Sequence, residues 1–421
     1  MLKDIDQEKG NATLDERSTS QSLARCSRYH YCTNGTWTIY TWSLFNQPLE
    51  NKFGWELNAV AITFSITSFA LAVSTLFAGK LQEKWGIRKL VAVAGVTLGM
   101  GLILSSFVSS LWTLYLLAGV VVGFADGTAY ITSLSNLIKW FPDRKGLISG
   151  VSVSAYGLGS LIFKYINGGL INSGGVSQAF LYWGTMVLLM VVVGSFLLKD
   201  AVTIEATDEA TQHGKTNFTV KEMLRTKQVY LLFVMFFTAC MSGLYLISIV
   251  KDIGVQLAHL DVAVAANAVA LIAIFNTTGR IILGALSDKV DRLKIVAATF
   301  IVTAGAVLVL SFADLNYTIF LICVATIAFG FGGNITVFPA IVGDFFGLKN
   351  HSKNYSIVYQ GFGLGALSGS FIAAWMGGFK PTFHVIGILC VLSFLIAMMI
   401  KPPIHGEDRG KLRVKPHSRL A

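Results

Sequence analysis

Three charged side chains, those of Asp126, Lys164 and Arg280, fall inside long uncharged stretches of the sequence. A charge at the centre of a membrane-spanning helix costs about 2.5–3.5 kcal/mol on insertion scales, so such a residue is by default a candidate for function. Lys164 lies near one end of its stretch, where its aliphatic stem can carry the ammonium group to the lipid headgroups. The stronger candidates for chemistry are therefore Arg280 and Asp126.

Arg280 precedes Asp288, which marks the end of its apolar stretch, by two helical turns. This spacing places the guanidinium about 12 Å into the membrane, too deep to reach water easily. Asn276 lies one turn away on the same face. A guanidinium offers a fork of donors that matches one carboxylate, so we expect these two residues to line a site for a small organic anion. The alternative is a structural ion pair between Arg280 and Asp126.

Asp126 lies in the middle of its apolar stretch, with Tyr130 one turn further on. Desolvation and a neighbouring cation act in opposite directions on the proton affinity of a carboxylate. Asp126 is therefore our candidate for carrying a proton. The alternative is a static ion pair or a hydrogen-bonded contact between helices.

The apolar stretches predict an all-α membrane protein. Hydrophobic residues make up 54% of the 421-residue chain and charged residues 13%, about half the charged share of a soluble domain. A stretch of about 20 apolar residues spans a bilayer, and the sequence has eleven clear ones and a weak twelfth ahead of them at 33–46. The eleven are 57–79, 90–109, 113–138, 146–170, 178–198, 229–250, 263–286, 295–313, 317–343, 354–376 and 382–400.

The longest polar stretch between spans, at 199–228, divides them into two sets of six. We expect one bundle at 33–198 and another at 229–400, with polar tails at 1–32 and 401–421. All but five of the 33 lysines and arginines fall on the side of the central loop and both tails. The positive-inside rule makes that side the cytoplasm, so we expect both termini there.

Other function classes are disfavoured. The net charge of +10 is spread over short loops and not gathered on one face, which argues against a nucleic-acid partner. The cysteines have no metal-ligand spacing, and no catalytic constellation is visible, so we expect neither an enzyme nor a bound metal. Gly361, Gly363 and Gly365 match a dinucleotide-binding pattern, but they lie inside a span and lack the required strand. We therefore expect no cofactor.

Two loops repeat each other. The loop after the second span reads GKLQEKWGIR at 79–88, and the loop after the eighth reads GALSDKVDR at 284–292. Glycine, leucine, acid and base recur in the same order at an offset of 205 residues. The offset indicates duplicated halves, as in transporters whose site lies between two repeats.

These loops resemble the cytoplasmic motif of the major facilitator superfamily. The resemblance implies twelve transmembrane helices in two pseudo-symmetric six-helix bundles, with alternating access around a central site. It also implies that the loop charges latch the two halves in one state; the alternative is that they only set the topology. Asp291 departs from the motif, because the family has its second glycine there. The latch residues that we expect are Gly79, Glu83, Lys84, Arg88, Asp288, Lys289 and Arg292.

Three more passages, YTWSLFNQP at 40–48, KWFPDRKG at 139–146 and EMLRTK at 222–227, are similar to the oxalate/formate antiporter family. The similarity runs over 38–402 and is greatest to the pyruvate-associated members of bacterial inner membranes. It implies that an arginine at the position of Arg280 binds the anionic substrate. The other substrate-binding residues that we expect are Tyr40, Tyr130, Tyr359, Asn276 and Gln360.

Phe362 marks a departure from that family, whose oxalate-transporting members carry a lysine there. A dicarboxylate would leave one buried charge unmatched, which is expensive. We therefore expect a secondary transporter of a monocarboxylate such as pyruvate, lactate or formate, monomeric and coupled to protons or to exchange. An oxalate/formate-type exchanger and a non-transporting membrane sensor are the alternatives.

The first span is unusual. Residues 27–35 are polar where the resembled family has an apolar helix, and about 14 uncharged residues remain before Asn46, too few for an ordinary span. We expect a defective or truncated first helix.

Overall fold

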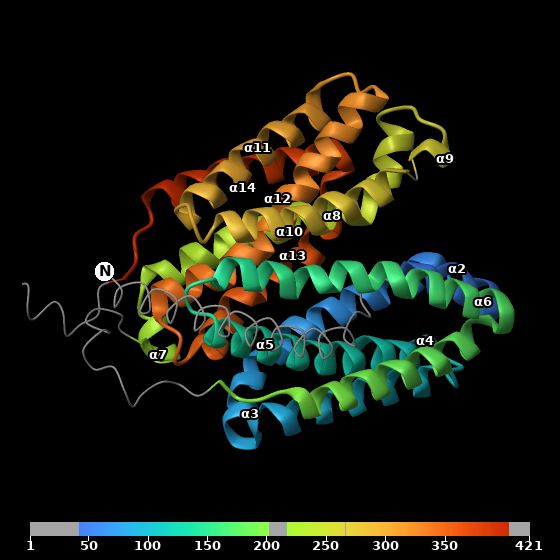
Figure 1. Cartoon of the computed structure of the whole chain (residues 1–421). Coiled ribbons are helices and arrows are strands. Elements are labelled where there is room, and N and C mark those ends of the chain that lie inside the picture. Colours follow the sequence, from blue (N-terminus) through green and yellow to red (C-terminus); the bar gives the residue numbers. More distant parts are fainter. Residues whose placement is uncertain (1–41, 202–216, 266, 404–421) are drawn as a thin grey trace, which may run out of the picture.

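The computed structural model describes residues 42–201, 217–265 and 267–403, and the regular structure of these residues is helical throughout (Figure 1). Tyr40 and the side chain of Lys164 lie outside the described part of the chain, as do the N-terminal tail and nearly all of the C-terminal tail. The helices are α2 (Ser43–Phe53), α3 (Leu57–Ser105), α4 (Leu111–Leu114), the π-helical η3 (Tyr115–Val121), α5 (Val122–Trp140), α6 (Lys145–Leu197), α7 (Val220–Met223), α8 (Lys227–Gln256), α9 (Val262–Ala265), α10 (Asn267–Leu286), α11 (Arg292–Phe312), α12 (Tyr317–Phe346), α13 (His351–Met376) and α14 (Phe379–Met399).

The eleven clear spans predicted from the sequence all fall on helical segments, with 113–138 running over α4, η3 and α5 and 263–286 over α9 and α10. α3 and α6 each hold two spans, and the chain turns back inside them at Gly86 (φ 73°) and Gly175 (φ 76°). Glycine suits these turns because it tolerates positive φ without steric strain. Seven stretches of the described helices are long and apolar enough to cross a membrane by length and composition. α2 corrects one predicted boundary, because it continues past residue 46 to Phe53.

Asp291 explains why the second repeated loop needs no glycine at this position. It has φ −52° and caps α11, because its Oδ1 accepts hydrogen bonds from the backbone N–H groups of Leu293 at 2.9 Å and Lys294 at 3.2 Å. Its counterpart, Gly86, has a positive φ. The two loops therefore reverse the chain by different local means.

The helices form two sets. In the first set α3 packs on α5 and α6, and in the second α10 packs on α12 and α11 on α14. Between the sets, α3 contacts α13 and α6 contacts α10. Figure 1 shows the two sets close together near α7 and diverging toward α2 and α9.

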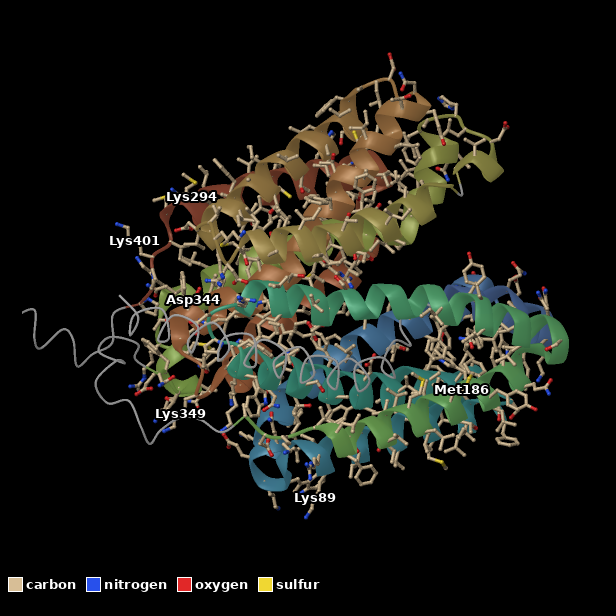
Figure 2. All side chains as sticks on the ribbon, in the orientation of Figure 1. Lys89, Met186, Lys294, Asp344, Lys349 and Lys401 are labelled. Atoms are coloured by element: carbon tan, nitrogen blue, oxygen red, sulfur yellow. The ribbon has the colours of Figure 1, made fainter. Side chains whose placement is uncertain are left out.

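Basic side chains gather where the two sets converge. Figure 2 places Lys294, Lys349 and Lys401 towards that end of the molecule. We call it the basic end, and it comprises the loops at 80–89, 139–145, 289–294 and 349–353.

Candidate functional site

Arg280 lies where helices of the two halves touch. It is 1% exposed, and its Nη1 donates a hydrogen bond to the backbone carbonyl of Val153 on α6 at 2.7 Å. The two helices approach closely because Gly150 has no side chain: a Cβ there would lie 2.5 Å from the carbonyl oxygen of Arg280. The guanidinium therefore faces the other half of the molecule and not lipid.

One acceptor of the Arg280 guanidinium, the backbone carbonyl of Val153, is a neutral oxygen. A guanidinium forms shorter and stronger hydrogen bonds with a carboxylate than with a neutral oxygen. A small carboxylate that reaches this position can therefore replace the carbonyl with a better acceptor.

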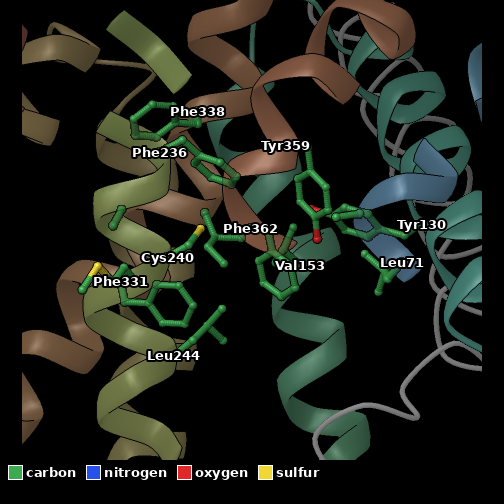
Figure 3. Close-up of a cluster of buried hydrophobic side chains, with 14 of the residues drawn as sticks. Leu71, Tyr130, Val153, Phe236, Cys240, Leu244, Phe331, Phe338, Tyr359 and Phe362 are labelled. Atoms are coloured by element: carbon green, nitrogen blue, oxygen red, sulfur yellow. The ribbon is translucent and has the colours of Figure 1, made fainter. Parts of the chain in front are cut away.

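Aromatic side chains from both halves pack beside Val153 (Figure 3). The ring centroids of Tyr130 and Tyr359 lie 5.2 Å apart, so this pair joins α5 to α13. Phe362 stacks on Tyr359 at 5.2 Å, with an interplanar angle of 10°. These four residues are at most 4% exposed. Because tyrosine supplies an apolar wall with a polar tip, the surroundings of Val153 are mostly apolar.

Asp126 is fully buried in α5, one turn before Tyr130. α5 and α3 are in close contact here, since a Cβ on Gly127 would lie 2.1 Å from the carbonyl oxygen of Leu71. Asp126 thus lies on the helix that carries Tyr130 into the aromatic cluster, in the half opposite to Arg280. Its role in proton coupling stays a prediction.

The side-chain amides of Asn276 and Gln360 take part in helix packing. Asn276 donates to a backbone carbonyl of α12 at 3.2 Å. Gln360 donates to a backbone carbonyl of α3 at 2.8 Å and to Thr75 Oγ1 at 3.3 Å, which joins the two halves. Thr75 is the counterpart of Arg280 at the offset of 205 residues. Both copies of this position therefore contact the opposite half, and substrate binding by the two amides stays a prediction.

Asp288 joins the halves at the basic end. Its carboxylate accepts hydrogen bonds from the backbone N–H groups of Gly146 and Leu147, each at 2.8 Å. These groups belong to the first turn of α6, where a carboxylate satisfies unpaired donors and meets the positive end of the helix dipole. Arg292 donates to the same carboxylate at 2.7 Å. Asp288 of one half thus caps a helix of the other.

The first copy of the loop contacts α13 through fewer and more exposed interactions than Asp288 makes with α6. Glu83 pairs with Lys353 at an N–O distance of 2.5 Å, and the side chain of Glu83 is 60% exposed. Gly79 lies against the same lysine, because a Cβ on Gly79 would be 2.7 Å from its Cγ. This contact also crosses between the halves, but it is open to solvent.

Three predicted latch residues do not reach the contact between the halves in the part of the chain that the structure describes. Arg88 donates to the backbone carbonyl of Leu198 within its own half. Lys84 and Lys289 are exposed. Each of these lysines directly follows the acidic residue of its loop, and adjacent residues of a helix face in different directions.

Asp344 is a contact residue that the sequence did not reveal. Lying near the end of α12, it forms ion pairs with Arg292 and, at 2.6 Å, with Lys145 at the start of α6. Lys139 is its counterpart at the 205-residue offset. A charged residue therefore stands at the same helix end in both halves, and this repetition was the signal that could have identified Asp344.

His351 was also missed. It begins α13, is fully buried, and lies 3.1 Å through Nδ1 from Ser135 Oγ and 2.9 Å through Nε2 from the Pro339 carbonyl. Burial lowers its pKa from 6.5 to about 4. The imidazole is therefore neutral, and it joins a helix of the first half to a helix of the second.

The profile of the Major Facilitator Superfamily matches residues 31–338 and, in a second match, 255–419. The chain belongs to this superfamily. It is 46% identical over 332 residues to an uncharacterized major-facilitator-type transporter, YhjX, of Escherichia coli, covering 78% of this chain and 82% of that protein. It is 28% identical to the oxalate:formate antiporter of Oxalobacter formigenes, covering 90% and 91%. These relatives confirm the resemblance to the oxalate/formate antiporter family.

Solved structures of the superfamily share the fold. The transporter FucP in the outward conformation aligns with a TM-score of 0.68 and covers 88% of this chain and 99% of its own, at 12% identity. The proton:xylose symporter XylE aligns with a TM-score of 0.71, covering 90% and 96%, also at 12% identity. Membership of this superfamily makes the chain a multi-pass membrane transporter and not an enzyme.

Proposed function

We propose that this transporter carries a small monocarboxylate, of the pyruvate, lactate or formate class, by alternating access. The observation that supports the proposal is the buried guanidinium of Arg280, hydrogen-bonded to the Val153 carbonyl where α6 meets α10. A carboxylate that enters between the halves can replace the Val153 carbonyl, a neutral acceptor, on this guanidinium.

The aromatic cluster supports a substrate with one negative charge. Phe362, at the position where the resemblance implies a lysine in oxalate carriers, is 4% exposed and stacks on Tyr359. A second carboxylate there would be buried without a cation. Two relatives are named for carboxylate substrates. They are the oxalate:formate antiporter and, at 31% identity over 136 residues, human monocarboxylate transporter 11.

We further propose that Asp126 carries a proton and that the basic end faces the cytoplasm of a bacterium, with both termini on that side. The positive-inside rule supports this orientation in the inner membrane. The position of Asp126, one turn from Tyr130 on the same helix, supports a role beside the substrate. We propose a monomer as the working unit.

Counterflow of labelled pyruvate, lactate, formate and oxalate into proteoliposomes tests these assignments. We expect Arg280→Ala to abolish monocarboxylate exchange, Arg280→Lys to retain a fraction of it, and the exposed Lys84→Ala to match the native chain. Asp126→Asn should keep exchange but lose uptake driven by a pH gradient. Equal rates for Arg280→Ala and the native chain would remove Arg280 from the site. Faster exchange of oxalate than of the monocarboxylates would favour the dicarboxylate antiporter. Substrate binding without any flux would favour a sensor.

A further inference from the structure

A polar cavity lies at the basic end, between the first loop copy and the start of α13, outside the Arg280 site. Its volume is about 130 Å³, several times what one water molecule needs. α3, the end of α5 and the segment after α6 line one side, and the α12–α13 connection lines the other. The lining residues are Gly79, Gln82, Glu83, Lys139, Asp200, Lys349, Asn350, Ser352 and Lys353.

The carboxylates of this cavity are already engaged. Glu83 pairs with Lys353. Asp200 accepts a hydrogen bond from the backbone N–H of Ile87 at 3.3 Å. Because three lysines and only two carboxylates line the cavity, its charge favours an anion over a cation.

Two further features point to an oxygen-rich anion. Ser352 is 5% exposed, and its Oγ has no hydrogen-bond partner among the described residues. It lies on the first turn of α13, where Asn350 supplies no side-chain cap; the Asn350 amide donates instead to the Phe218 carbonyl. The first N–H groups of a helix have no partner within the helix, and they attract anions. A hydroxyl donor, a helix N-terminus and lysines thus border one space.

Lys139 is half-buried at this cavity, whereas Lys349 is exposed. Burial lowers the pKa of Lys139, and Lys353 lowers it further, whereas Glu83 and Asp200 raise it. A bound anion would stabilise the charged form of this side chain. The lysine therefore gains a favourable contact when the cavity is filled.

We propose that this cavity binds a small oxyanion with the chemistry of phosphate, and that the bound anion stabilises the conformation in which the basic end is closed. Ser352 and the N-terminus of α13 donate hydrogen bonds to the anion, while Lys139 and Lys349 supply charge. Because the lining residues come from both halves, opening the basic end takes the site apart. The proposal rests on alternating access and is independent of the transported substrate.

Linkage gives the size of the effect. A ligand that binds one state only stabilises it by a factor of 1 + [L]/Kd, which is about tenfold at ten times Kd. An anion bound at the basic end would therefore stabilise the closed conformation of that end and slow its reopening.

The test uses the full chain, purified in detergent, with inorganic phosphate replacing chloride at constant ionic strength. Calorimetry measures binding, and spin labels on Lys89→Cys and Lys294→Cys measure the distance across the basic end. We expect phosphate to bind and to raise the ratio of the short-distance to the long-distance population about tenfold. Lys139→Gln and Ser352→Ala should each weaken this response at least tenfold, whereas Lys84→Gln, exposed at the same end, should respond like the native chain.

The lipid is a second source of phosphate groups. Nanodiscs of phosphatidylcholine with and without phosphatidylglycerol, free of inorganic phosphate, separate the two sources. A shift with phosphatidylglycerol that Ser352→Ala abolishes would assign the same site to a headgroup phosphate. No response to either source, or the same response in Lys139→Gln, Ser352→Ala and Lys84→Gln, would overturn the proposal.

Discussion

The two copies of the repeated loop close the same end of the molecule by contacts of unequal strength. In the second copy the Asp288 side chain is 10% exposed, and it accepts hydrogen bonds from two backbone N–H groups of α6 and from Arg292. In the first copy the Glu83 side chain is 60% exposed and pairs with Lys353. A buried charged hydrogen bond contributes about 1.5–3 kcal/mol, whereas an exposed ion pair contributes about 0.2–1 kcal/mol. The second copy thus makes the more buried contact between the halves, whereas the first borders the cavity at the basic end.

The largest expected effect comes from removing the close approach of α6 and α10. In Gly146→Val, the added Cβ would lie 1.9 Å from Ser287 Oγ and 2.4 Å from the Gly284 carbonyl oxygen. We expect counterflow to fall more than a hundredfold, with a longer distance between the labels at Lys89→Cys and Lys294→Cys. Gly168→Val on the same helix is the matched control, because no atom lies within 4 Å of its Cβ position. Equal losses in both variants would contradict this reasoning.

Asp288→Asn should have the next largest effect. The amide keeps the size of the side chain but loses the charge that faces the start of α6. We expect the closed population at the basic end to fall about 10- to 100-fold, measured by the same distance. Asp291→Asn is the control, since Asp291 caps α11 within its own half. An unchanged distance in Asp288→Asn would mean that the second copy is no stronger than the first.

Acid should also open the basic end through His351. In the closed state burial holds the pKa of His351 at about 4, against 6.5 in water. A state that exposes the imidazole binds a proton more readily, so the closed state loses stability as pH falls below 6.5 and is unaffected above it. At pH 5.5 this linkage predicts an opening of about tenfold. His351→Gln should remove this dependence; persistence of the full response would assign it to another group.

Glu83→Gln should have the smallest effect. Exposed ion pairs are screened by salt and contribute about 1 kcal/mol or less. We expect less than a fivefold shift in the closed population, shrinking further at 1 M salt. A shift as large as that of Asp288→Asn would reverse the ranking of the two copies.

The fold could be predicted because each membrane span can be recognised from its own stretch of sequence. A run of apolar residues sets each helix, and Gly86 marks a reversal that needs positive φ. The burial of Arg280 agrees with its place two helical turns inside an apolar stretch.

The partners of these residues could not be predicted, because they lie far away in the sequence. Asp288 meets Gly146 across 142 residues, and Lys353 meets Glu83 across 270. His351 gave no signal, because its burial depends on how α13 packs against the opposite half. Such contacts depend on the packing of two preformed bundles, which single-sequence patterns do not encode.

The backbone carbonyl of Val153 has a consequence for the proposed transport cycle, because it gives the Arg280 guanidinium an acceptor when no substrate is bound. Under the proposed function, a carboxylate that binds would replace this oxygen, and the guanidinium would return to it when the carboxylate leaves. The empty carrier could then reorient without leaving this hydrogen bond unmade.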